Sequence, residues 1–445
     1  MRQALIRRFG VWAALAMIVA EVMGVGVFLT PAEMSRTLGS TGWVLGVWAL
    51  MAVMSAAGAL CYAELGTRYP EAGGGYVFLR EAFGERTAFV YGWMSLLVMD
   101  PGLTAALGVG LATYLLALFG APTTLVPVVA IASIVILAAL SMLGVEASSR
   151  ILRVTAVAKL ATVAVLIVAV LVRGGGAEAT TVATTSGMPS FPVLAGALMG
   201  AFFAFGGWWD LGKMSEEVVE PRRTLPFALV GGILVVGLVY AGLSLAFIHV
   251  MAGRQHATTD VFVTSLGSAL FGERAAAVLA GAVVVAVAGS LAAVLLGAPR
   301  VYLAMARNGV FPSGLVRFDS RRQSAPRATL IQVTLACILV MLGTFEQIVG
   351  YFVPTVVFFL GLSAAAILIL PRPRDDAQVF RAPWHPLPII LFLALVTMMV
   401  ALFAMGRPLQ TLIGAAVVAL GIPVSWLVIR SPRRGGVVLA ADERR

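Results

Sequence analysis

Glycines interrupt two apolar segments of this chain at places where main-chain groups could bind a small polar molecule. Gly24 and Gly26 flank Val25 in the first segment, and Gly206 and Gly207 are adjacent in the sixth. Within lipid, a helix unwinds only where other protein or a polar cavity satisfies the freed amides and carbonyls. Two Gly-interrupted segments at corresponding positions of two halves indicate the central binding site of a secondary transporter. The spacing therefore predicts recognition by backbone N–H and C=O groups.

Side chains that carry enzymatic or metal chemistry are scattered along the chain. The histidines His249, His256 and His385 are far apart, and Cys61 and Cys337 both fall inside apolar segments. No cluster of histidine, cysteine and carboxylate has the spacing of metal ligands, and no nucleophile–base constellation is visible. The pattern predicts no enzyme, no metal site, no cofactor and no disulfide framework.

The composition indicates a membrane protein. Of 445 residues, 60% are hydrophobic and 12% are charged, and the mean hydropathy is +0.99, which lies far outside the usage of soluble proteins. The net charge of +10 comes from basic residues in short loops rather than on one face, which argues against nucleic acid as a partner. The partner that the sequence predicts is the lipid bilayer.

Twelve apolar segments approach the length of about 20 residues that a bilayer core requires. The breaks lie in the first and the sixth, and because five is odd, the two halves enter the membrane from opposite sides, as in an inverted repeat. We expect one transporter domain over residues 1–430, with repeats over 12–172 and 192–370, two added helices over 387–429, and a basic cytoplasmic tail over 431–445. The segments are 12–29, 42–63, 88–119, 123–143, 151–172, 192–213, 226–251, 275–305, 328–345, 349–370, 387–404 and 408–429.

The basic residues predict the orientation. With the amino terminus inside, 25 of the 31 lysines and arginines fall on the cytoplasmic side and five on the outer side, and Lys159 lies within the membrane. This bias on an even number of helices predicts that both termini are cytoplasmic. Because arginine greatly outnumbers lysine and the termini are short, we expect a multi-pass protein of the cell membrane, the inner membrane of a prokaryote.

Four motifs stand in a consistent order along the chain. They are Gly24–Phe28 with Pro31, Gly58–Thr67 followed by Pro70 and Gly73–Tyr76, Phe202–Trp208 followed by Glu216, Glu217, Pro221 and Arg223, and Ala306–Gly309 with Pro312. Together they resemble the amino acid–polyamine–organocation (APC) superfamily, closest to its L-type amino acid transporters, over about residues 10–430. The resemblance implies an all-α fold of twelve transmembrane helices, with a five-plus-five inverted repeat in which helices 1 and 6 are discontinuous.

An amino acid substrate, which the resemblance implies, would bind at both breaks. Backbone N–H groups of Val25, Gly26 and Val27 would stand at the start of a half-helix, whose positive dipole end favours a carboxylate. Carbonyls of the second break would accept from the ammonium, and glycine avoids a Cβ that would obstruct the bend and the ligand. The residues assigned to the second break are Phe203, Ala204, Phe205, Gly206 and Trp208.

Coupling and gating are assigned to four residues. The resemblance implies that Phe203 closes over the substrate from outside. An ammonium within a membrane segment costs about 3 kcal/mol or more, so Lys159 is expected to serve a pathway or a partner. The resemblance implies that the Lys159 cation replaces the sodium ion of sodium-coupled relatives. Those relatives bind the ion with several hydroxyl groups, and in this chain Ser290 is nearly the only hydroxyl residue in that region. We therefore expect sodium-independent transport, in which Lys159, Ser290, Phe203 and Glu21 take part.

Acids near the breaks leave the substrate class open. Glu21 lies one turn before the first break, Asp100 precedes Pro101 within the third segment, and Asp210 follows Trp209, where L-type members often carry asparagine. Such acids could select for the charge of a cationic substrate, or could neutralise Lys159.

The sequence predicts a sodium-independent secondary transporter of a small amino acid, either an exchanger or a proton-linked porter, working by alternating access. A carrier of cationic amino acids or polyamines is the alternative if Glu21 or Asp210 faces the ligand. An alternative of another class is a membrane nutrient sensor that binds amino acids without transport. The sequence leaves open whether an accessory subunit or a second copy joins the chain.

Overall fold

The structure is a computed structural model that describes residues 7, 9–142, 155, 157, 159–169, 172, 187–251, 262–311, 326–371 and 379–429. The predicted tail over 431–445 and parts of the predicted fifth segment over 151–172 lie outside the described residues.

Helices make up almost all of the regular structure in these ranges, and an isolated β-bridge joins Phe9 to Val218. The helices are α1 Val11–Val22, α2 Gly26–Leu38, α3 Thr41–Arg68, α4 Gly75–Phe83, α5 Glu85–Met94, η1 Ser95–Met99, α6 Asp100–Phe119, η2 Thr123–Leu125, α7 Val126–Met142, α9 Phe191–Ala204, α10 Asp210–Lys213, η4 Ser215–Glu217, α11 Pro221–Met251, α12 Phe262–Phe271, α13 Glu273–Gly297, α14 Pro299–Arg307, α15 Pro326–Leu342, α16 Phe345–Ile369, α17 Leu387–Gly406 and α18 Pro408–Val428.

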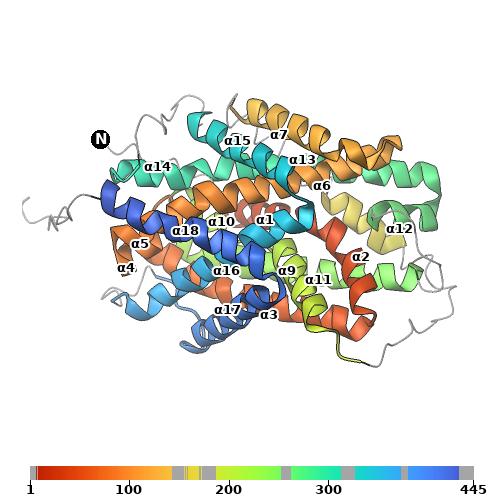
Figure 1. Cartoon of the computed structure of the whole chain (residues 1–445). Coiled ribbons are helices and arrows are strands. Elements are labelled where there is room, and N and C mark those ends of the chain that lie inside the picture. Colours follow the sequence, from red (N-terminus) through yellow and green to blue (C-terminus); the bar gives the residue numbers. More distant parts are fainter. Residues whose placement is uncertain are drawn as a thin grey trace, which may run out of the picture.

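Eight described stretches are long and apolar enough to cross a membrane without interruption. Shorter apolar helices occupy Lys159–Ala169, Phe191–Ala204 and Pro326–Leu342. The long helices run in the same general direction across Figure 1, with α1 near the middle of the bundle. The prediction of an all-helical polytopic membrane protein is confirmed at this level. The uninterrupted stretches are Thr41–Arg68, Glu85–Phe119, Thr123–Met142, Pro221–Ile248, Arg274–Arg307, Phe345–Ile369, Leu387–Gly406 and Pro408–Val428.

Both glycine motifs interrupt a helix. The helix α1 ends at Val22 and α2 begins at Gly26, while α9 ends at Ala204 and α10 begins at Asp210. Gly207 has a φ of +108°, a conformation that is open to glycine and strained for residues with a Cβ. The first amides of a helix have no partner within it, so each interruption leaves polar main-chain groups in the middle of an apolar bundle.

The two interruptions are in direct contact. A Cβ built on Gly26 would lie 2.5 Å from Ala204 Cα, so that the absence of a side chain lets α2 pack against the end of α9. Tyr240 of α11 adds a polar tie, because its hydroxyl lies 2.9 Å from the carbonyl oxygen of Val22 and 2.8 Å from that of Ala204. One buried phenol thus holds the ends of α1 and α9 together.

A π-helical turn lies beside the breaks, between α5 and α6. The turn, η1, runs from Ser95 to Met99 and is followed by Pro101. Proline has no N–H to donate four residues back, and the carbonyl of Leu97 instead accepts from the hydroxyl of Tyr351 in α16 at 3.3 Å. Such turns often occur at functional sites, and this one brings Met99 and Asp100 toward the two breaks.

The connection after α10 is fixed to the start of α1 and to α14. Phe9 exchanges backbone hydrogen bonds with Glu217 and Val219 at 3.1 and 2.9 Å. Glu217 also pairs with Arg300 at 3.0 Å, and Glu216 pairs with Arg307 at 3.3 Å. These contacts hold the short helix α10 in place from its C-terminal side.

Candidate functional site

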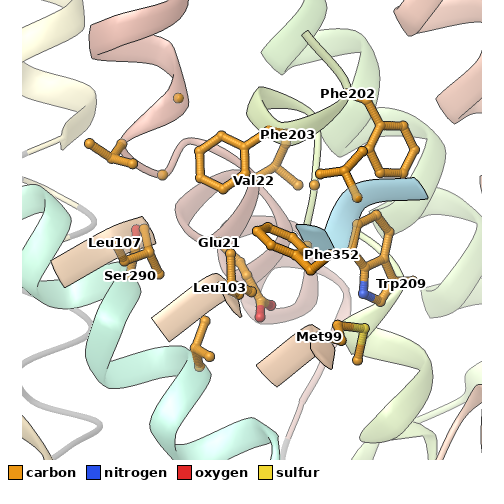
Figure 2. Close-up of a pocket in the computed structure, with 17 residues that line it drawn as sticks. Glu21, Val22, Met99, Leu103, Leu107, Phe202, Phe203, Trp209, Ser290 and Phe352 are labelled. Carbon is orange, nitrogen blue, oxygen red and sulfur yellow. The ribbon is translucent and has the colours of Figure 1, made fainter. Parts of the chain in front are cut away.

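A cavity of about 30 Å³ lies between the two breaks (Figure 2). Its volume is enough for a water molecule or two, so the side chains around it would have to move to admit an amino acid. Its wall comes from both breaks and from the helices α6, α13 and α16. The lining residues are Glu21, Val22, Gly24, Val25, Gly26, Met99, Leu103, Leu107, Phe202, Phe203, Gly206, Gly207, Trp209, Ser290, Val294, Phe352 and Val353.

Glu21 is the acidic side chain of this wall. Its Cγ packs directly on the second break, since a Cβ on Gly207 would lie 3.0 Å from it. The carboxyl oxygen Oε2 is buried, and no described group donates a hydrogen bond to it. The charges that act on this carboxyl are those of Asp210, Lys213 and Lys159. A single acid therefore joins the end of α1 to the second break at the cavity.

Ser290 of α13 supplies a hydroxyl from another part of the wall. It accepts a hydrogen bond from Lys159 Nζ at 2.5 Å, and Lys159 itself is 2% exposed and is not among the lining residues. A Cβ on Gly24 would lie 3.8 Å from the Ser290 hydroxyl oxygen. The buried ammonium therefore stands behind a serine hydroxyl that borders the first break.

Aromatic rings close the remaining sides. Phe203 packs edge-on against Phe345 and Phe352 of α16, with ring centroids 5.4 and 6.1 Å apart. Trp209 stacks on Phe202 with centroids 5.9 Å apart and an interplanar angle of 16°. Figure 2 shows Phe203, Phe352 and Trp209 around the centre of the cavity. These rings make the wall apolar and occupy space that a ligand side chain would need.

Several residues assigned to substrate binding point elsewhere. Trp208 packs against Tyr62 of α3 and Phe392 of α17, with centroids 5.2 and 6.4 Å away, and Phe205 packs against Tyr240 at 5.2 Å. Among the assigned residues, the wall contains Val25, Gly26, Phe203 and Gly206, but not Val27, Ala204, Phe205 or Trp208.

Asp100 and Asp210 share a buried cation. Lys213 Nζ lies 2.9 Å from Asp210 Oδ1 and 3.7 Å from Asp100 Oδ1, and all three side chains are at most 7% exposed. The hydroxyl of Tyr302 in α14 donates to the other oxygen of Asp100 at 2.5 Å. Both acids therefore have internal partners, and neither lines the cavity.

Lys213 is a charged residue whose burial was not predicted from the sequence. Its side chain is 2% exposed and lies beside α6, close to Asp100. The spacing of Asp210 and Lys213 contained the signal, because residues three apart share a helix face. Trp209 was mentioned as a departure from the L-type pattern, but its position in the cavity wall was not predicted.

Comparison with known proteins identifies the family. The sequence profile described as amino acid permease matches residues 9–426. The chain belongs to this family. The APC resemblance with an L-type character is thereby confirmed.

The relatives that match are transporters of amino acids. The serine/threonine exchanger SteT of Bacillus subtilis is 26% identical over 392 residues, which cover 87% of this chain and 89% of the relative. The b(0,+)-type amino acid transporter 1 of Mus musculus is 27% identical over 413 residues, covering 91% and 82%. The mouse large neutral amino acids transporter small subunit 2 is 26% identical over 443 residues, covering 95% and 81%.

Proposed function

We propose that this chain transports a small amino acid across a membrane by alternating access, without sodium, as an exchanger or a proton-linked porter. The observation that carries the proposal is the cavity between the two helix breaks. A half-helix N-terminus provides donors for a carboxylate, and an acid together with freed carbonyls provides acceptors for an ammonium. An amino acid presents both of these groups on one carbon atom.

The architecture that we propose for this activity has twelve transmembrane helices in a five-plus-five inverted repeat. The described residues contain eight uninterrupted spans and the shorter apolar helices Lys159–Ala169 and Pro326–Leu342. The interrupted pairs α1–α2 and α9–α10 supply the remaining two and place polar main chain at the centre. The repeats would cover 12–172 and 192–370, with both termini in the cytoplasm of a prokaryotic cell. In that arrangement, the half-helices move while α6 and α13 hold the site.

The narrow cavity supports a small substrate. The cavity of about 30 Å³ is bordered by Trp209 and Phe352, whose rings would have to withdraw for a bulky side chain. Alanine, serine or glycine would need less movement than leucine or phenylalanine. The exchanger that is similar to this chain is named for serine and threonine, which are also small.

Sodium independence is supported by the contact between Lys159 and Ser290. The ammonium lies 2.5 Å from the hydroxyl, in a place where a bound cation would be repelled by it. We expect uptake to be equal in sodium and choline buffers. Lys159→Met should lower turnover while leaving the affinity for the substrate unchanged in competition assays.

The alternative of a cationic amino acid or polyamine carrier rests on Glu21, which faces the cavity. Asp100 and Asp210 give it less support, because both are paired with Lys213. A sensor that binds without transport would show binding but no flux. The deciding experiment is uptake into proteoliposomes that contain unlabelled amino acid, with alanine, serine, leucine, arginine and putrescine as competitors.

Countertransport of alanine or serine would support the proposal. Strong inhibition by putrescine alone would favour the polyamine alternative, and binding without flux would favour the sensor. One relative is named a small subunit, which makes an accessory subunit the first partner to test by co-purification and by measuring the mass of the complex.

A further inference from the structure

Two of the carbonyls assigned to the second break are already engaged. The carbonyl of Phe203 accepts from the amide of Gly206 at 3.0 Å, and the carbonyl of Ala204 accepts from the hydroxyl of Tyr240 at 2.8 Å. Carbonyl oxygens have two lone pairs, but these contacts reduce what they can offer to a ligand. A further acceptor would therefore strengthen the binding of a substrate ammonium.

One oxygen of Glu21, Oε2, provides an acceptor that is not engaged. It lines the cavity, and its Oε2 is buried with no hydrogen-bond donor in the described part of the chain. A buried carboxyl oxygen without a donor is costly. A ligand that brings a cationic N–H group into the cavity would satisfy this oxygen.

The neighbouring charges leave this role to Glu21. On α10, Lys213 lies between Asp210 and Asp100, so its charge is balanced by these two acids. The other cation near Glu21 is Lys159, at the start of the helix Lys159–Ala169, and it donates a hydrogen bond to Ser290. When its three acids are all ionised, the group of Glu21, Asp210 and Asp100 with Lys213 and Lys159 carries one net negative charge, which a substrate ammonium would balance.

The other end of the cavity has the opposite character. The Ser290 hydroxyl lies near Gly24, it has the Lys159 ammonium behind it, and the first amides of α2 begin at Gly26. These groups attract an anion. In Figure 2, Ser290 lies on one side of Glu21 and Trp209 on the other. The cavity therefore has an acidic end and an anion-attracting end, which matches the two charges of an amino acid.

We propose that the Glu21 carboxylate is the counter-ion of the substrate's ammonium group, and that this side chain makes the site select amino acids over the corresponding hydroxy acids. The inference rests on the proposed function and specifies how that site recognises its substrate. A lactate molecule has the carboxylate and the side chain of alanine, but a neutral hydroxyl replaces its ammonium.

The test is a binding assay that does not depend on flux. Purified wild-type protein and the variants Glu21→Gln and Glu33→Gln are titrated with L-alanine and L-lactate, and with L-leucine and its 2-hydroxy counterpart, while thermal unfolding is followed. Glu33 is a matched control, because it is an exposed acid on α2 that pairs with Arg36 at the surface. Glutamine keeps the shape of Glu21 and removes its charge.

The wild type and Glu33→Gln should prefer each amino acid over its hydroxy acid by tenfold or more, which corresponds to about 1.4 kcal/mol. In Glu21→Gln this preference should fall to less than threefold, even if both affinities weaken. A ratio is informative here because general damage to the fold lowers both affinities together.

Two results would overturn the proposal. If Glu21→Gln binds with the full preference for the amino acids, another group recognises the ammonium. The same holds if Glu21→Gln loses the pH dependence of amino acid affinity seen in the wild type but keeps the full preference, because Glu21 would then only carry a proton. If no amino acid stabilises the wild type, the proposed function itself has failed, and that outcome is distinct from the other two.

Discussion

The two helix breaks have similar glycines but present different surfaces to the cavity. The first break is three residues long, and a Cβ on Gly24 would meet Leu107 and Ser290 at the ordinary distances of 3.7 and 3.8 Å. The second break is five residues long, and Gly207 combines a φ of +108° with a Cβ position 3.0 Å from Glu21. The first break therefore leaves room beside its amides, whereas the second is filled by side chains.

This difference suggests that the two breaks have different roles at the cavity. The first break offers main-chain donors at the start of α2, and the second determines the shape of the cavity through Phe203 and Trp209. Gly26 has a packing role instead, because a Cβ at this position would lie 2.8 Å or less from the Cα and Cβ atoms of Ala204 at the end of α9. The absence of a side chain thus leaves room for a ligand at Gly24 and allows close helix packing at Gly26.

The largest effect is expected for Gly24→Leu. Its side chain would extend into the cavity while its Cβ meets no atom closer than 3.7 Å, so the fold should survive and uptake should fall at least 100-fold, or about 2.8 kcal/mol at 1.4 kcal/mol per tenfold. Uptake in proteoliposomes and thermal unfolding in detergent are measured together. Gly196→Leu is the control, since nothing lies within 4 Å of its Cβ position on α9. Normal uptake by Gly24→Leu would refute the assignment of the first break to ligand space.

Gly207→Ala should destabilise the protein by about 1–3 kcal/mol, because a Cβ is strained at this φ and also crowds Glu21. Thermal unfolding of the purified protein checks this, with Gly196→Ala as the unstrained comparison. Equal melting temperatures for the two variants would show that the second break is less constrained than its geometry indicates.

Trp209→Ala should broaden the substrate range. Removal of the indole enlarges the cavity, so that uptake of leucine relative to alanine should rise about tenfold, or about 1.4 kcal/mol. The matched variant is Trp208→Ala, because Trp208 packs away from the cavity against Tyr62 and Phe392. That variant should lose stability without changing the ratio. A change of the ratio in Trp208→Ala alone would reverse the roles of the two tryptophans.

The smallest effect is expected for Asp210→Asn. Asp210 pairs with Lys213, and Lys213 keeps Asp100 as a second partner at 3.7 Å. For a neutral amino acid, the affinity should change less than tenfold, or by less than about 1.4 kcal/mol. Competition by alanine and putrescine measures it. A much larger loss, together with putrescine binding, would indicate that Asp210 contacts a cationic substrate.

Much of the fold could be predicted from the sequence by itself. Long apolar segments must be helices in lipid, since only helices and closed barrels satisfy their own main chain there. The glycine motifs at Gly24 and Gly206 marked both interruptions, and four ordered motifs indicated the family that the profile match shows. These properties depend on composition, local spacing and order along the chain, which any reader of the sequence can see.

Which side chains come together around the central cavity was decided only by the tertiary structure. It placed Glu21 against Gly207 and brought Ser290 to Lys159 across 131 positions of sequence. It also directed Trp208 away from the cavity into the core, while Trp209 lines the cavity. It also buried Lys213 between two aspartates. Sequence spacing fixes neighbours along one helix face, but contacts between helices depend on how far each helix is rotated and where it is broken. The sequence therefore shows where the helices are broken and which residue types lie there, whereas the packing of the helices determines which of these residues are in contact.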